Sequence, residues 1–263
     1  KLFQSAKSYR TRMKSVAIIP AKYSSSRFPG KPLAEINGLP MVVLVCQNIM
    51  QAKRVDKVIV ATDDERISSV LDKYNIPFVL TSSQIPTGTD RIYKAYKQMN
   101  EEFDIIINVQ GDEPLLFGSD LDNLIDNFNT DEFDVATFVS PIRNYEELVN
   151  PNNVKVAVGE NNRALYFSRS VIPHLRDFEM KEWLDKQTYW KHIGIYAYKA
   201  NTLEFFVNTQ QTKIELSEKL EQLRLLEYGY RFQCIPLNKT LIGVDTPEDL
   251  EKIKILFNTK NEI

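Results

Sequence analysis

The sequence is poor in the residues that build metal centres and disulfide frameworks, because its 263 residues include only two cysteines and two histidines. Cys46 and Cys234 stand far apart, and neither belongs to a CxxC or zinc-ligand spacing. This pattern argues against a zinc ribbon and against a disulfide-rich secreted fold. We therefore expect two buried free thiols, as is usual in the reducing cytoplasm.

Long apolar runs and an excess of one charge are also lacking. No run approaches the roughly 18 apolar residues that a membrane-spanning helix needs, so we expect no membrane span. The formal net charge is −2, which favours neither nucleic acid nor an acidic membrane as a partner. Any anionic ligand must therefore be bound by a local cluster of cations.

Acidic residues are missing from the first 13 residues, which are basic and rich in hydroxyl groups. Such a composition suits either a transit peptide or a disordered tail. We expect residues 1–13 to form an N-terminal tail outside the fold.

What the chain does contain is a regular alternation of two patterns. Short runs rich in β-branched residues predict strands at 15–20, 57–62, 77–82 and 104–110, and longer stretches predict helices at 40–53, 63–75 and 87–100. Strands that alternate with helices pair in parallel, so the expected fold class is α/β with a doubly wound, mostly parallel sheet.

From about residue 130 the alternation gives way to strands with few helices between them, at 133–139, 154–159, 164–169 and 192–199. This change predicts a smaller subdomain of mixed β-structure at 141–229, with a core at 14–140 and 230–263. The pattern also predicts one helix at 217–229, ended by Gly229.

The loop after the first strand, residues 21–31, carries the cations Lys22, Arg27 and Lys31 among several serines. In a doubly wound sheet, ligands bind beyond the carboxyl ends of the strands, where this loop belongs. Its cations and backbone N–H groups suit a phosphate-bearing ligand, although a solvated surface loop is the alternative. The loop has neither the spacing of a P-loop nor that of a dinucleotide-binding turn.

The same loop, IPAKYSSSRFPGKPL, resembles the signature of sugar-activating cytidylyltransferases, and most of all that of the 3-deoxy-manno-octulosonate (Kdo) cytidylyltransferase family. Other stretches resemble the family in the same order: VATDDERI, TGTDRI, NVQGDEPLL, ALYFSRSVIP, HIGIYAY, LEQLRLLEYG and GVDTPEDLE. The resemblance runs from about residue 15 to residue 258. It implies a nucleotide-diphospho-sugar transferase type of sheet, with the core binding the nucleotide and the range 141–229 serving sugar binding and dimerisation.

The resemblance also implies a reaction. CMP moves from CTP to the anomeric hydroxyl of a keto-sugar acid, pyrophosphate is released, Mg²⁺ is the cofactor, and the product enters lipopolysaccharide biosynthesis. The protein is expected to be a homodimer. The chemistry requires cations for the triphosphate and carboxylates for the metal, because charge builds on the phosphate oxygens.

Residues for CTP and the metal follow from the matching motifs. The resemblance assigns the phosphates to Lys22, Arg27 and Lys31, the base-reading segment to Thr87, Gly88 and Thr89, the metal to Asp112 and Asp245, and catalysis to Lys31, Asp112 and Asp245. Without the resemblance, Asp112 reads as a turn residue before Pro114, Asp245 as a helix-entry residue, and Thr87 or Thr89 as a helix N-cap.

Residues for the sugar acid follow in the same way. The resemblance assigns them to Gln110, Arg169, His192, Tyr196, Glu221 and Gln222. A carboxylate-bearing sugar needs a cation and several hydrogen-bonding partners, which this set supplies. Glu221 and Gln222 are adjacent on a predicted helix and point about 100° apart, so they cannot share all their contacts.

The exact acceptor stays open at this point. The sequence departs from the family's usual residues at Ile85, where His is common, and at Thr87, where Ser is common. Variants that lack this His include enzymes that activate the 8-amino form of the sugar. The alternatives are therefore Kdo, its 8-amino form or another keto-sugar acid, and a protein that binds CTP without turnover.

Overall fold

A computed structural model describes residues 12–24, 27–239 and 241–260 of the chain. Its main feature is a nine-stranded sheet with the order β11-β7-β10-β6-β1-β4-β5, to which β8 and β9 are attached beside β10. The strands of this sheet are β1 (Ser15–Ala21), β4 (Lys57–Thr62), β5 (Phe78–Leu80), β6 (Ile105–Asn108), β7 (Val135–Pro141), β8 (Lys155–Val158), β9 (Ala164–Ser168), β10 (Trp190–Lys199) and β11 (Phe232–Pro236).

Most pairs in the central sheet are parallel. β1 pairs in parallel with β4 and β6, β4 with β5, and β11 with β7, whereas β10 is antiparallel to both β6 and β7. The predicted fold class, α/β with a mostly parallel sheet, is therefore confirmed. A separate two-stranded ribbon consists of β2 (Glu35–Ile36) and β3 (Leu39–Pro40).

Helices cover both faces of the sheet. They are α1 (Met41–Ile49), α2 (Glu65–Lys73), α3 (Gly88–Gln98), α4 (Gly118–Asn127), α5 (Tyr145–Val149), α6 (Trp183–Lys186), α7 (Ala200–Asn208), α8 (Lys213–Glu218), α9 (Gln222–Glu227) and α10 (Pro247–Lys260). Alternate side chains of β1 point to opposite layers, as the pleat of a strand requires. Val16 and Ile18 belong to the cluster with α3, α7 and α9, and Ala17 and Ile19 to the cluster with α1 and α4.

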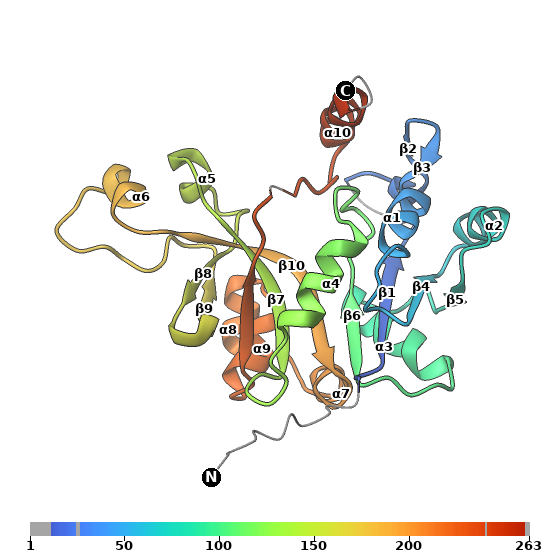
Figure 1. Ribbon diagram of the computed structural model, residues 1–263, viewed down its shortest axis with the longest axis horizontal. Helices are drawn as coiled ribbons and strands as arrows, with labels where there is room; N and C mark the ends of the chain where they lie inside the picture. The colour runs from blue at the N-terminus through green and yellow to red at the C-terminus, as the bar shows by residue number, and fades with distance from the viewer. Residues whose placement is uncertain (1–11, 25–26, 240, 261–263) are drawn as a thin grey trace, which may run out of the picture.

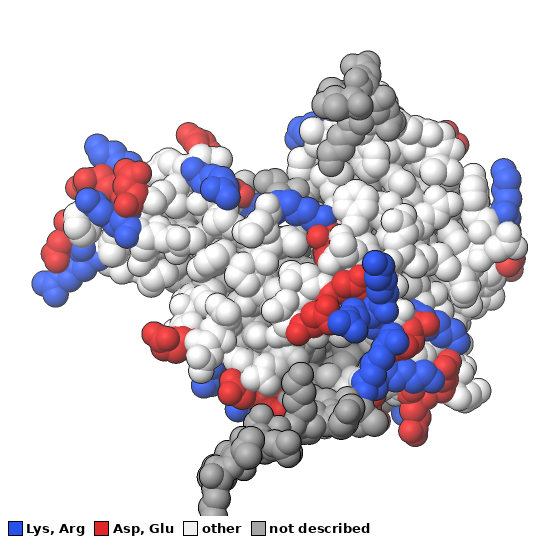
Figure 2. Space-filling view, in the orientation of Figure 1, with Lys and Arg blue, Asp and Glu red and all other residues white. Residues whose placement is uncertain are grey.

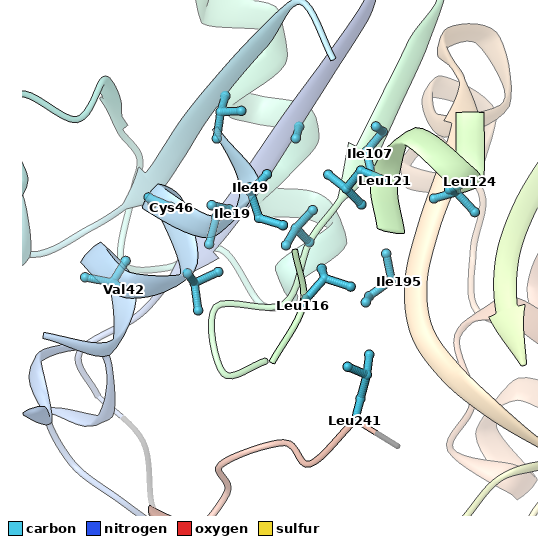
Figure 3. Packing of buried hydrophobic residues seen from close by; sticks show 14 of the residues in the cluster. Ile19, Val42, Cys46, Ile49, Ile107, Leu116, Leu121, Leu124, Ile195 and Leu241 are labelled. Atoms are coloured by element: carbon cyan, nitrogen blue, oxygen red, sulfur yellow. The ribbon is translucent and has the colours of Figure 1, made fainter. Parts of the chain in front are cut away.

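The larger core cluster is shown in Figure 3, where Ile19 and Ile107 of the sheet lie between side chains of α1 and α4. Cys46 lies in this cluster, and Cys234 in the one on the other face of the sheet. Both thiols are free and buried, as expected, and burial raises the pKa of each to about 12. Each fully buried Ile or Val contributes about 1.5–3 kcal/mol to stability.

Strand β10 decides how the second half of the chain joins the first. It lies between β6 and β7, inside the central sheet, although its residues fall in the range 141–229 that was assigned to the smaller subdomain. The backbone pairing therefore runs through the expected boundary without a break. What does project from the body is an arm at one end of the molecule that carries α5 and α6, whereas β8 and β9 pack against the body through the buried Val156 and Phe167 (Figure 1).

Two local expectations are corrected. The stretch 217–229 is not one helix but the end of α8, a break, and α9, because Lys219 adopts a left-handed conformation with φ 54°. Gly229 follows α9 with φ 85°, as expected of a residue that ends a helix. The tail prediction for residues 1–13 falls mostly outside the described residues, but Met13 packs against the larger core cluster and thus belongs to the fold.

Charged side chains of both signs are interspersed on the face seen in Figure 2. This agrees with the nearly balanced composition. Within the described ranges, no helix combines the length and apolar character needed to cross a membrane.

Candidate active site

A cleft of about 400 Å³ lies beyond the carboxyl ends of β1 and β6, where a doubly wound sheet binds its ligands. Both the loop after β1 and the entry to α3 contribute to its wall. Six of the residues expected to bind CTP or the metal line it: Lys22, Arg27, Lys31, Thr87, Gly88 and Asp112. Ser25 and Ser26 of the same loop lie outside the described residues.

Lys31 is positioned by a turn in the residues just before it. The backbone N–H of Lys31 donates to the carbonyl of Phe28 at 3.2 Å, and Gly30 has φ 73°. Pro29 followed by a glycine with positive φ is the arrangement of a type II turn. This conformation favours glycine at position 30 and delivers Lys31 to the floor of the cleft, at the start of a short 3₁₀ helix, Lys31–Leu33.

Two carboxylates meet at the amino group of Lys31. Its Nζ lies 2.5 Å from Oδ2 of Asp112 and 3.4 Å from Oδ1 of Asp245. The guanidinium of Arg27 approaches the same oxygen of Asp245 at 3.0 Å. Residues from three distant parts of the chain therefore converge on one point at the edge of the cleft.

Asp245 reaches this point because its segment is tied to the turn after β6. The backbone N–H of Val244 donates to the carbonyl of Asp112 at 2.9 Å. Beyond it, Asp249 and Thr246 exchange hydrogen bonds at the entry to α10, which fixes where that helix begins. The segment therefore leads into a helix, and Asp245 lies within 3.4 Å of Lys31, which lines the cleft.

The donor set at this point fits a magnesium ion that is held jointly with a ligand. Asp112 and Asp245 bring oxygens of two carboxylates to a single cationic group, and Mg²⁺ is commonly bound by one or two carboxylates plus phosphate oxygens. Among the described residues, no cluster of three or more His, Cys, Asp or Glu is arranged to hold a metal. Oxygens from the ligand would therefore have to complete the coordination.

The entry to α3 combines a helix cap with a link to another helix. Thr87 is the N-cap and accepts from the backbone N–H of Asp90 at 3.0 Å. Thr89 is buried, and its hydroxyl donates to Glu221 at 2.9 Å. The hydroxyl of Thr89 is thus engaged inside the protein, whereas Thr87 and Gly88 line the cleft.

Arg91 lies one turn further along α3 and lines the first cleft, where it connects α3 to the segments that follow β4 and β5. Its guanidinium donates to Thr81 at 2.6 Å and to Asp63 at 2.9 Å. The Arg91 and Asp63 side chains are only 2% and 5% exposed. Arg91 is therefore paired with Asp63, the acid that directly follows β4.

A second cleft of about 380 Å³ lies beside β10, and three of the residues expected to bind the sugar line it: His192, Tyr196 and Gln222. His192 Nε2 lies 3.0 Å from the hydroxyl oxygen of Thr137. That hydroxyl has one proton and also lies 3.1 and 2.8 Å from the carbonyl oxygens of Ile193 and Ile195, an arrangement that is satisfied when the neutral ring carries its proton on Nε2. The other ring nitrogen, Nδ1, is then an acceptor. Burial lowers the pKa of His192 to about 3, so the ring is neutral at ordinary pH.

Gln110 connects the two clefts. Its side chain lines the first cleft, while its Nε2 donates to the carbonyl of Gly194, which lines the second, at 3.0 Å. The pairing of β10 with β7 shifts register between Ile193 and Tyr196, and such bulges re-aim the side chains around them. The bulge lies beside the carbonyl that Gln110 binds.

The other two residues expected to bind the sugar lie elsewhere. The guanidinium of Arg169 donates hydrogen bonds to the backbone carbonyls of Pro151, Glu218 and Lys219. Arg169 does not line the second cleft. Glu221 points to Thr89, while its neighbour Gln222 lines the second cleft, in keeping with the divergence expected for adjacent helix residues.

Glu113 is a residue of the second cleft that the sequence did not single out. Burial, reinforced by the nearby charge of Asp112, raises its pKa to about 8, and the charge of Lys191 acts in the opposite direction. Its Oε2 is buried without a hydrogen-bond partner in the described part of the chain. The signal was present in the sequence, since Glu113 follows Asp112 directly in the QGDEP motif.

Comparison with known proteins identifies the family. A family model described as cytidylyltransferase matches residues 16–239. The 3-deoxy-manno-octulosonate cytidylyltransferase of Parabacteroides distasonis is 44% identical over 244 residues, which cover 91% of this chain and 96% of the relative. The enzyme of the same name from Cytophaga hutchinsonii is 43% identical, over 90% of this chain and 95% of the relative.

The chain belongs to the 3-deoxy-manno-octulosonate cytidylyltransferase family. A solved structure of CMP:2-keto-3-deoxy-manno-octonic acid synthetase complexed with CTP superposes with a TM-score of 0.86 at 38% identity, covering 94% of this chain and 99% of that one. A thymidylyltransferase-like structure from Bacillus anthracis, 14% identical with a TM-score of 0.63, shares the fold alone. The predicted family and the prediction of a cytidylyltransferase enzyme are confirmed.

Proposed function

We propose that this cytidylyltransferase holds CTP in the first cleft and the sugar acid in the second. The two substrates react where the clefts meet, beside Gln110. CMP passes from CTP to the anomeric hydroxyl of Kdo, and pyrophosphate leaves. The product, CMP-Kdo, is the activated sugar for lipopolysaccharide biosynthesis. The convergence of Lys31, Asp112 and Asp245 at the edge of the first cleft is the single observation that carries this assignment.

Charge is the main chemical problem of the reaction, because the phosphorus atom under attack carries anionic oxygens and the leaving pyrophosphate gains more. Lys22, Arg27 and Lys31 line the first cleft and supply positive charge for the triphosphate. Asp112 and Asp245 would hold Mg²⁺. When bound there, the ion would neutralise phosphate charge and lower the pKa of a coordinated hydroxyl.

Positioning is the second contribution of the protein. Thr87 and Gly88 offer a backbone edge to the base at the entry to α3, and their place is fixed by the Thr87 cap. His192 Nδ1 offers an acceptor to a sugar hydroxyl in the second cleft, and Gln222 and Tyr196 offer further hydrogen bonds. Holding two reactants in contact accounts for a large part of the rate of such transfers.

Pyrophosphate release is the direct test. The purified protein is mixed with CTP, Mg²⁺ and either Kdo or its 8-amino form, and both pyrophosphate and the nucleotide sugar are measured. We expect release only when all three components are present. No release above background with either sugar would contradict the proposal.

The same experiment separates two other candidates. Ile85 lines the first cleft at the position where His is common in the family, and this favours keeping the 8-amino sugar as a second candidate acceptor. Faster turnover of the 8-amino sugar than of Kdo would identify the 8-amino sugar as the acceptor. Binding of CTP without any product would instead indicate a nucleotide-binding protein that has lost turnover.

We further propose a cytoplasmic homodimer. The buried free thiols suit a reducing compartment. The projecting arm carries exposed apolar side chains, including Phe178 and Met180, that a second copy could cover. Light scattering of the purified protein tests this state, and a monomeric mass at micromolar concentration would contradict it.

A further inference from the structure

If the second cleft receives a sugar acid, a positively charged side chain must neutralise the carboxylate of that acid. Among the described residues that line this cleft, Lys191 is the only Lys or Arg. His192 beside it is neutral, because burial lowers its pKa to about 3. The neighbouring groups Glu113, Tyr196 and Gln222 carry no positive charge.

Arg169, the cation expected from the sequence, is already committed. Its Nε donates to the Glu218 carbonyl at 2.8 Å, and its two terminal nitrogens donate to the carbonyls of Pro151 and Lys219 at 3.1 and 3.4 Å. These bonds join the loop after α5 to the break between α8 and α9. Arg169 therefore supports the wall behind the cleft.

Lys191 is held at the cleft with spare bonding capacity. Its Nζ donates to Oε1 of Glu147 at 2.8 Å, and the two side chains are 19% and 22% exposed. An ammonium group has three N–H bonds, and no second partner of this Nζ is found within the described ranges. Two N–H bonds therefore remain for a ligand.

Glu147 is itself fixed to the rim of the cleft. Its backbone carbonyl accepts from the side chain of Asn153, which lines the cleft, at 2.9 Å. Glu113 lines the same cleft as Lys191. Lys191 is thus a partly buried cation with one anchoring partner, facing a cleft that contains an acid.

We propose that Lys191 receives the carboxylate of the acceptor sugar acid, with Glu147 holding the ammonium group in place. This inference rests on the proposed function, because it assumes that the acceptor occupies the second cleft. The Nζ would donate one hydrogen bond to Glu147 and one or two to the carboxylate. Lys191 then selects an acid over a neutral sugar, whereas Lys31 serves the nucleotide.

The test compares Lys191→Met with wild type, using Kdo and its carboxamide, which has the same sugar ring without the charge. We expect the KM for Kdo to rise about 10- to 100-fold, as for loss of a charge-assisted hydrogen bond. The KM for CTP should stay within about twofold. Wild type should prefer Kdo to the carboxamide, and Lys191→Met should lose that preference, which a merely structural defect would not cause.

Three further variants make the outcome decisive. Lys199→Met is the matched control, since Lys199 lies on the same strand and pairs with Asp134 at 3.2 Å away from the cleft; it should keep the preference. Lys191→Arg keeps the positive charge and should retain most of the preference for Kdo over the carboxamide. If Lys191→Met does not fold, the preference is measured in Lys191→Arg instead. Arg169→Met distinguishes the two cations.

An unchanged preference for the acid in Lys191→Met, or its loss in Arg169→Met alone, overturns the inference. Calorimetric binding of Kdo to the CTP-loaded protein separates this from a failure of the proposed function. Wild type that binds Kdo through Lys191 without turnover would refute the function and keep the inference. Absence of both binding and turnover would refute both.

Discussion

The Nζ of Lys31 lies 2.5 Å from Oδ2 of Asp112, although 81 positions separate the two residues in the sequence. The pair is partly buried, with the Lys31 side chain 17% exposed. A cation held this way neutralises the carboxylate before any ligand arrives. It also stands ready at the place where a triphosphate would add negative charge.

Replacing Lys31 with Met should therefore reduce kcat/KM for CTP by about 100- to 1,000-fold, the usual loss when one stabilising donor is removed from a transition state. Steady-state pyrophosphate release measures the effect. Lys57→Met is the control, because Lys57 forms a comparable pair with Glu101 at 2.9 Å outside the cleft. Kinetics equal to wild type in Lys31→Met would show that this loop does not bind the triphosphate.

Asp245→Asn should abolish turnover while the fold survives, because the exchange is nearly isosteric but removes a carboxylate charge that the proposed Mg²⁺ site requires. Turnover is followed as a function of Mg²⁺ concentration, and circular dichroism checks the fold. Asp249→Asn changes an aspartate of the same segment that caps α10 and does not contact Lys31. It should stay active, whereas full activity in Asp245→Asn would remove Asp245 from the metal site.

Arg91→Met should lower the free energy of unfolding by about 3–5 kcal/mol, because it leaves the buried charge of Asp63 without its partner. Urea unfolding of the purified protein measures the change. The double variant Arg91→Met with Asp63→Asn removes the unpaired charge and should recover part of the loss. If the double variant were the sum of its two single variants, the ion pair would not be the cause.

The neutral state of His192 predicts how stability depends on pH. The folded pKa is about 3 against 6.5 for a free histidine, so between these values the unfolded chain binds a proton that the folded protein does not. Stability is therefore lost as pH falls from about 6.5 toward 3, by at most about 1.4 kcal/mol per pH unit.

The check on this pH dependence is His192→Gln, which retains a donor for Thr137 but does not titrate. The slope of unfolding free energy against pH, measured from pH 6.5 to 4.5, should be smaller in the variant than in wild type by up to that amount. Equal slopes would mean that His192 is protonated in the folded protein. Other titrating groups are common to both proteins and cancel in the difference.

Local patterns were enough to predict much of the fold. The apolar run that became β1 and the acid-capped start of α2 depend on neighbouring residues, and both were predicted close to their observed bounds. The single helix at 217–229 was wrong because Lys219 adopts a left-handed conformation, which nothing in the amphipathic pattern indicates. The place of β10 inside the sheet depends on pairing with strands far away in the sequence.

The candidate site was less accessible to sequence reasoning. The nearness of Lys31 to Asp112 follows from parallel strands ending at one edge, whereas the arrival of Asp245 needed the family resemblance. The contacts of Arg169 and Glu221 could not be predicted, because carbonyls and a threonine elsewhere in the chain compete for their side chains. Lys191 stands next to the HIGIYAY motif, but its place on the wall of the second cleft depends on contacts that are distant in the sequence.

The hydrogen bond from the Val244 N–H to the Asp112 carbonyl has a consequence for the synthesis of the protein on the ribosome. The last strand of the sheet ends at Pro236, so a ribosome that has released the chain up to that residue has already delivered the whole sheet. The second carboxylate emerges later, with the segment that docks on the turn after β6. A truncated product ending directly after Pro236 would keep every strand but lack Asp245 and the buried Leu241, Val244 and Ile253 of the larger core cluster. Premature termination there would therefore remove the second carboxylate and part of the core together.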